Sequence, residues 1–400
     1  MLAAEVEPAS ELDSRRGWVV VAAAFLSTFV VYGIVYSFGA FFDSMAAEFG
    51  TGKGATALMF SITTAWYFGL GLVAGKAADR FGPRPVMLVA AGTLGVALVA
   101  TSRVTSIWVG YVTYGLGVGI AVACAYVPMV ATVGAWFVRR RTTALGVAVA
   151  GIGAGTLVLA PLSERLIDAY GWRTAYVVLG VGGAGLLLVA SLGAHRPPLG
   201  PAQSPARLRS IVRDRGFVIL YVSCLVLSMA LFVPFVFLKS YATDEGIAAG
   251  QAATLVGLIG ASSVAGRLGL GALGARLGAT RLMQLSFLVL TLSFAIWLAA
   301  GDSYPMLVLY TVVMGVAYGG FIALAPAVAA GLFGTLGLGA ILGALYTAAG
   351  VGGLVGPPII GEVIDRSSYT VGLVLAMALA AGSTAVLFLL PAGHDRTARR

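Results

Sequence analysis

The chain is dominated by long apolar runs that follow one another with few charged residues between them. Most of these runs reach about 20 residues, the length that an α-helix needs to cross a bilayer. Hydropathy predicts twelve such helices, at 17–42, 55–78, 84–102, 106–136, 142–168, 172–194, 216–240, 248–275, 280–300, 304–332, 338–364 and 369–391. We therefore expect an all-α integral membrane protein without a sizeable soluble domain.

The charge content leads to the same fold class. Charged residues make up 10% of the chain and hydrophobic residues 59%. Soluble domains contain about 25% charged residues, so the water-soluble classes of protein are excluded. With an even number of crossings, both termini are expected on one side of the membrane.

The basic residues are distributed unevenly between the two sides. Alternate loops place 18 of the 25 on one side: Arg15, Arg16, Lys76, Arg80, Arg84, Arg139, Arg140, Arg141, Arg196, Arg207, Arg209, Arg213, Arg215, Arg276, Arg281, Arg396, Arg399 and Arg400. The other side has six: Lys53, Arg103, Arg165, Arg173, Lys239 and Arg366. The positive-inside rule makes the first side cytoplasmic, in a cell membrane. The net charge of +9 then reflects topology and contact with lipid, and no nucleic-acid partner is expected.

A proline- and arginine-rich stretch at 195–215 is predicted to be a cytoplasmic linker between two six-helix bundles, at 1–194 and 216–400. The two halves share a repeat. An offset of 197 residues aligns Gly146, Gly153, Gly155, Leu157, Pro161, Ile167 and Asp168 with Gly343, Gly350, Gly352, Leu354, Pro358, Ile364 and Asp365. Internal repeats of this kind build many secondary transporters, whose substrate sites lie near the membrane midplane.

The loop after the second predicted helix carries a motif of glycines and charges. Its sequence GKAADRFGPR, from Gly75 to Arg84, resembles the Gly-x-x-x-Asp-Arg-x-Gly-x-Arg loop of the major facilitator superfamily. A weaker copy, from Gly271 to Arg281, lacks the acid. The resemblance implies a latch between the two halves on the cytoplasmic side, made of Gly75, Asp79, Arg80, Gly82, Arg84 and Arg276.

Two further stretches resemble signatures of the monocarboxylate transporter family, including its bacterial members and the related oxalate/formate exchangers. Gly17-Trp18 opens the first helix. Trp136-Phe137, the basic triplet Arg139–Arg141 and a run of small residues open the fifth. The resemblance covers essentially the whole chain. It implies alternating-access transport of small monocarboxylates such as lactate or pyruvate, with a proton as the co-substrate.

Arg267 is the one basic residue expected near the membrane midplane. It lies nine residues inward from Arg276, roughly 13 Å along the helix. A guanidinium there costs about 2.5 to 3.5 kcal/mol on insertion scales, so it needs water, an anion or a polar partner. The sixteen acids are expected in tails, loops and helix ends, which leaves backbone carbonyls as the alternative partners. The resemblance implies that Arg267 binds the substrate carboxylate, as an arginine on the eighth helix does in the family.

Five hydroxyl-bearing residues are predicted to surround this arginine. Tyr126 and Tyr318 lie near the middle of the fourth and tenth helices, and both match family positions. Ser263 lies one turn before Arg267 on the same helix face. Tyr36 and Tyr346 are weaker candidates, and Tyr36 stands where animal members have a lysine.

The proton pathway stays open at this point. No His, Asp, Glu or Lys is expected to be buried, so a proton would travel with the substrate carboxylate or through tyrosines. One midplane charge suits a monocarboxylate better than a dicarboxylate.

The alternatives are carboxylate exchange, export of drugs or other organic solutes, and nutrient sensing on a transporter scaffold. An enzyme is not expected, because a buried nucleophile, base or metal cluster cannot be assembled from these residues. We expect no cofactor or metal, and a functional monomer.

Overall fold

The computed structural model describes residues 12–198, 211–334 and 338–390. Much of the predicted linker, and Arg396, Arg399 and Arg400, lie outside the described residues. The first half contains α1 (Arg15–Tyr36), α2 (Phe38–Phe49), α3 (Lys53–Phe81), α4 (Pro83–Thr101), α5 (Ile107–Gly110), the π-helical η2 (Tyr111–Leu116), α6 (Gly117–Trp136) and α7 (Arg141–Leu192). The second half contains α9 (Arg215–Leu231), α10 (Val233–Asp244), α11 (Ala249–Leu277), α12 (Ala279–Ala300), α13 (Tyr304–Phe333), α14 (Leu338–Arg366) and α15 (Tyr369–Leu387).

Eleven helical segments in the described part of the chain are long and apolar enough to cross a membrane. One of them, α7, has 52 residues, which would span about 78 Å if it were straight. Its backbone turns at Gly171, where φ is +77°, so α7 contains both of the predicted helices 142–168 and 172–194. The prediction of an all-helical membrane fold is confirmed, with the fifth and sixth crossings joined by this turn.

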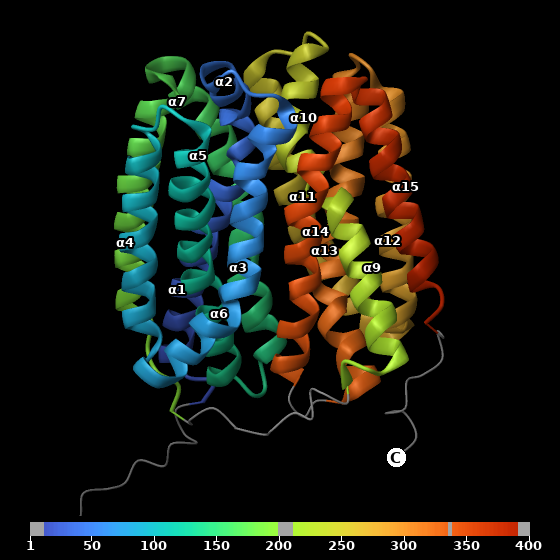
Figure 1. Ribbon diagram of the computed structural model, residues 1–400. Coiled ribbons are helices and arrows are strands. Elements are labelled where there is room, and N and C mark those ends of the chain that lie inside the picture. Colours follow the sequence, from blue (N-terminus) through green and yellow to red (C-terminus); the bar gives the residue numbers. More distant parts are fainter. Residues whose placement is uncertain (1–11, 199–210, 335–337, 391–400) are drawn as a thin grey trace, which may run out of the picture.

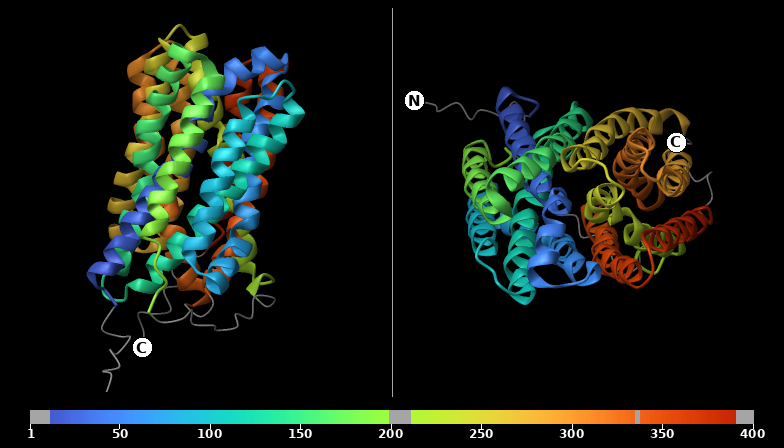
Figure 2. Two further views of the ribbon diagram at one scale, coloured as in Figure 1. Left: turned by 90° about the vertical axis from the view of Figure 1, so that its left-hand side faces the viewer. Right: turned by 90° about the horizontal axis from the view of Figure 1, so that it is seen from above.

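The helices stand side by side, with the described chain ends at one end of the bundle (Figure 1). Seen from above, the blue-to-green helices of the first half and the yellow-to-red helices of the second half form two groups (Figure 2). We call the end with the described chain ends the basic end, after Arg15, Arg80, Arg84, Arg139, Arg140, Arg141 and Arg276. The opposite, acidic end carries Asp43, Glu48, Glu164, Asp168, Glu362 and Asp365.

The first and seventh predicted crossings are each broken in the middle, which the sequence analysis did not predict. α1 ends and α2 begins around Ser37, whose hydroxyl donates to the backbone oxygen of Gly33 at 2.5 Å. Such a bond competes with the regular backbone hydrogen bonds of an α-helix. α9 ends at Leu231 just before Pro234, which removes a helical donor and clashes with the preceding turn. The two breaks lie at corresponding places in the two halves.

Glycines allow the helices to cross closely at equivalent positions of the repeat. A Cβ at Gly155 would lie 2.1 Å from the backbone oxygen of Phe29 on α1, and one at Gly352 would lie 2.3 Å from that of Leu225 on α9. The two glycines are partners in the 197-residue offset. Each therefore brings its helix against the broken helix of its own half.

The two signature stretches form one structural unit. The Trp18 and Phe137 rings meet edge to face, with centroids 5.2 Å apart. The Asp13 carboxylate accepts hydrogen bonds from the backbone N–H groups of Val138, Arg139 and Arg140 at 3.1 to 3.3 Å. Loss of hydration raises the pKa of Asp13, but these three donors outweigh that effect and lower the pKa. The start of α1 is thus held against the loop that begins α7.

Candidate functional site

Arg267 on α11 is buried between the two halves of the molecule. The residue is 6% exposed. Its Nη1 atom donates to the backbone oxygen of Val149 on α7 at 2.6 Å, so part of the guanidinium is bound by a carbonyl, the alternative left open by the sequence. Its Nε and Nη2 atoms are buried and have no hydrogen-bond partner among the described residues. Buried donors are nearly always satisfied in proteins, so two orphaned donors on one cation indicate a site for an acceptor.

Tyr318 and Tyr36 form a cross-bundle contact beside this arginine. The Arg267 Cζ atom lies 5.8 Å from the centroid of the Tyr318 ring, a cation–π distance. The Tyr318 hydroxyl forms a 3.0 Å hydrogen bond with the hydroxyl of Tyr36 on α1. The Tyr36 ring also stacks on Phe235 of α10, with centroids 4.1 Å apart. Tyr36, Phe235 and Tyr318 therefore form an aromatic layer that joins the two halves.

Tyr126 on α6 is half-buried and makes no direct bond to Arg267. Its ring meets the edge of Tyr32, at a centroid distance of 5.0 Å. Tyr32 in turn lies 5.5 Å from Tyr36 and 5.8 Å from Tyr67. Tyr32 and Tyr67 were not predicted from the sequence. Tyr32 could have been found from its spacing, because it lies one helical turn before Tyr36.

Ser263 and Tyr346 are not brought onto the guanidinium. The Ser263 hydroxyl donates to Gly260 of its own helix at 2.7 Å, and its role beside Arg267 or the ligand stays a prediction. Tyr346 on α14 packs near Phe68 of α3, with ring centroids 6.1 Å apart. No hydrogen bond joins Tyr346 to Arg267 within the described part of the chain.

At the acidic end, charged side chains from both halves meet. The Lys239 Nζ atom on α10 lies 3.4 Å from Glu164 Oε1 on α7 and 3.5 Å from Asp43 Oδ2 on α2. The Ser240 hydroxyl donates to Asp43 Oδ1 at 2.5 Å. Glu164 is 3% exposed and Lys239 is 8% exposed. The expectation that no acid or lysine is buried is therefore wrong, because packing of α2, α7 and α10 covers helix-end residues that hydropathy alone places near water.

The acidic end is closed by backbone contacts as well. A Cβ at Gly39 of α2 would lie 2.9 Å from the backbone oxygen of Phe235 on α10. The backbone N–H of Gly54 on α3 donates to the Asp365 carboxylate on α14 at 3.3 Å. Toward the basic end the ribbons of the same two helices diverge (Figure 1).

The predicted latch at the basic end is not formed in this structure. Asp79, Arg80, Arg84 and Arg276 are all exposed, and Asp79 has no ion pair among the residues described. Gly82 has a φ of +95° and ends α3. The structure thus places these residues on one surface without bringing the two halves together there.

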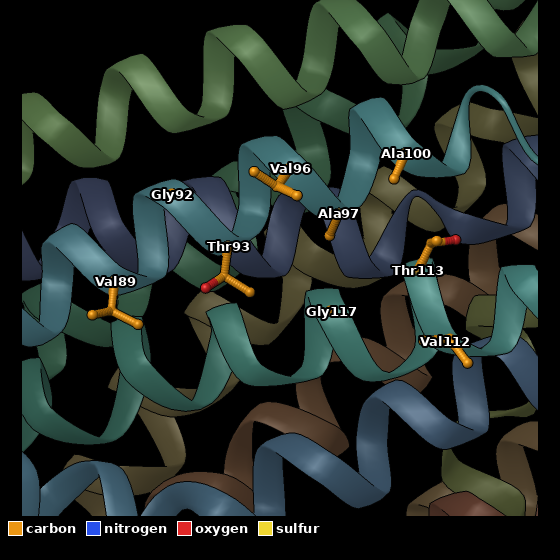
Figure 3. A pocket seen from close by; sticks show the side chains of 9 residues that line it. All are labelled: Val89, Gly92, Thr93, Val96, Ala97, Ala100, Val112, Thr113 and Gly117. Atoms are coloured by element: carbon orange, nitrogen blue, oxygen red, sulfur yellow. The ribbon is translucent and has the colours of Figure 1, made fainter.

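A groove of about 530 Å³ lies away from this site, between α4 and the η2–α6 segment (Figure 3). Among its nine lining residues, only Thr93 and Thr113 have a polar side chain. The groove contains no charged group and does not include Arg267.

The arrangement defines a class of protein, a helical membrane protein of two halves with a buried arginine between them. A family model described as Major Facilitator Superfamily matches residues 24–302. Monocarboxylate transporter 4 of Mus musculus is 32% identical over 401 residues, covering 94% of this chain and 83% of the relative. Monocarboxylate transporter 13 of Bos taurus is 30% identical over 388 residues, covering 95% and 90%.

Solved structures give the same fold. A bacterial homologue of the human lysosomal transporter Spinster, in an inward-facing and unoccupied conformation, aligns with a TM-score of 0.75 at 14% identity, covering 96% of this chain and 98% of that one. A nucleoside transporter aligns with a TM-score of 0.73, also at 14% identity, covering 96% and 100%. The chain belongs to the monocarboxylate transporter family of the major facilitator superfamily.

Proposed function

We propose that this protein carries small monocarboxylates such as lactate or pyruvate across the cell membrane, by alternating access and with a co-transported proton. The observation that carries the proposal is the pair of buried, unpartnered donors on Arg267. A guanidinium presents these donors as a fork that matches a carboxylate. An anion that accepts both bonds also removes the cost of the orphaned donors, about 1 to 3 kcal/mol each or more on a charged group.

Tyr318, Tyr36 and Tyr126 complete the proposed site. Tyr318 and Tyr36 wall it on the acidic side, where their mutual hydrogen bond closes the path. Tyr126 is half-buried, and α3 and α14 diverge toward the basic end (Figure 1). Tyr346 borders the same space from α14. The site therefore opens toward the basic end in this conformation.

The basic end faces the cytoplasm in this proposal, so the structure corresponds to an inward-open state. The two six-helix bundles rock about Arg267, and the Asp79 loop latches them when the cytoplasmic side closes. The protein works as a monomer, because the site is built from both halves of one chain. Oxalate/formate-type exchange is the second candidate mechanism, and the test below separates it from symport.

Uptake by proteoliposomes tests the function. We expect uptake of lactate, pyruvate or acetate, stimulated by an inward proton gradient, because symport couples the two flows. Lactamide has the shape of lactate without its charge, and we expect it not to be transported. Dependence on an internal counter-substrate would favour exchange. Preference for oxalate, or equal uptake of lactamide, would contradict the proposed monocarboxylate site.

A further inference from the structure

The ion-paired cluster at the acidic end has properties that the substrate site does not explain. Its three charged members, Asp43, Glu164 and Lys239, carry two negative charges and one positive charge. The Glu164 Oε2 atom is buried and has no hydrogen-bond partner among the described residues. A buried, unpartnered carboxylate oxygen is costly, and a proton on that oxygen removes most of the cost. One bound proton also brings the cluster to zero net charge.

We propose that Glu164 is a proton-binding site that controls closure of the acidic end. Proton binding forms an O–H bond at Oε2 and converts the carboxylate to a neutral carboxylic acid. The ion pair between Glu164 and Lys239 is then lost. Because Glu164 lies on α7 and Lys239 on α10, this pair joins the two halves of the molecule. Protonation therefore weakens one of the contacts that keep the acidic end shut.

The remaining contacts do not replace the lost ion pair. Lys239 would keep only Asp43, whose side chain is 42% exposed and is therefore screened by water. The third charged group acting on Glu164 is Asp168, one turn further along α7, and its negative charge also favours a bound proton. Lys239 is buried, and it keeps one of its two negative partners once Glu164 is neutral. Contact with water then stabilises its ammonium group. Separation of α2 and α7 from α10 admits that water.

This inference rests on the alternating access of the proposed function and adds a location for the proton. The aromatic layer of Tyr36, Phe235 and Tyr318 separates the ion-paired cluster from Arg267. Tyr36 comes before Asp43 on the way from α1 to α2, and Phe235 comes one turn before Lys239 on α10. A proton at Glu164 therefore acts on closure of the acidic end, without touching the substrate carboxylate.

The test measures the separation of the two halves at the acidic end without any substrate. Ala169 on α7 and Ala248, just before α11, are exposed, and one lies in each half. With Cys124 and Cys224 replaced by serine, nitroxide labels at A169C and A248C report this distance by double electron–electron resonance. We expect a longer-distance population to grow as pH falls from about 8 to about 5, because protons become more available to the buried, unpartnered oxygen of Glu164.

Glu164→Gln keeps the shape of the protonated side chain and removes its titration. We expect this variant to show the longer distance at all pH values in that range, with the pH dependence lost. Lys239→Gln removes the other partner and serves as the second variant, with the same expected opening. Glu48→Gln is the matched control, because the Glu48 carboxylate pairs with Arg173 within the first half at the same end. The control should keep the pH dependence of the parent protein.

The proposed role of Glu164 in closure would be overturned by an unchanged pH response in Glu164→Gln, or by a parent protein whose distances do not respond to pH. Shorter distances at low pH would also overturn it, since they mean that protonation closes the acidic end. Because no substrate is present, these outcomes do not depend on the uptake experiment. Failed uptake together with a pH-dependent distance would count against the substrate assignment alone.

Discussion

Replacement of Arg267 by alanine is expected to lower monocarboxylate uptake at least about 100-fold. Two hydrogen bonds between charged groups contribute about 1.5 kcal/mol or more each, and their loss amounts to about 3 kcal/mol. Initial uptake rates in proteoliposomes, normalised to the amount of inserted protein, give the measurement.

Arg267→Lys separates charge from geometry. A lysine keeps the positive charge but presents a point charge instead of a planar fork, so we expect uptake between those of the parent and alanine proteins. Arg281→Ala is the matched control, because Arg281 is exposed at the start of α12. It should transport at the parent rate. Uptake by Arg267→Ala within a factor of about two of the parent would contradict the assigned role.

The largest expected effect on stability comes from Gly319→Ala on α13. A Cβ at Gly319 would lie 2.0 Å from the backbone oxygen of Ser263 and 2.9 Å from the backbone nitrogen of Arg267 on α11. Backbone atoms cannot move aside as a flexible side chain can, so α13 must shift away from α11. We expect a cost of about 3 kcal/mol, which corresponds to a fall in Tm of roughly 6 to 12 °C for a bundle of this size.

Gly331→Ala is the control on the same helix. No described atom lies within 4 Å of a Cβ at Gly331, and alanine has a helix propensity higher than that of glycine by about 1 kcal/mol. Its Tm should equal or exceed that of the parent in a thermal unfolding assay in detergent. If Gly319→Ala unfolds at the parent temperature, the close crossing of α11 and α13 is not as described.

The fold was predictable because each crossing must be apolar and helical in a bilayer, whatever its neighbours. Predicted bounds such as 304–332 for α13 therefore agree with Tyr304–Phe333. The breaks in the first and seventh crossings were missed, although Pro234 gives a local signal for one of them. The division into bundles at 1–194 and 216–400 stays a prediction.

The site was predictable only in part. Arg267 stands out in the sequence because a single charge in the middle of an apolar run is costly. Burial of Glu164 and Lys239 depends on a contact between two side chains that are 75 residues apart in the sequence, so no local pattern reveals it. The Ser263 hydroxyl is bound within its own helix, a common alternative for serine. The charged latch residues are exposed in this structure, and the latch stays a prediction for another conformation of the proposed cycle.

Direct binding tests the central claim, that Arg267 holds the substrate carboxylate. Isothermal titration of the purified protein would use the monocarboxylate that gives the fastest uptake, with its uncharged amide as the comparison ligand. The proposed site predicts binding of the acid to the parent protein, no detectable binding of the amide, and loss of acid binding in Arg267→Ala. Equal binding of the acid by parent and Arg267→Ala proteins would contradict it.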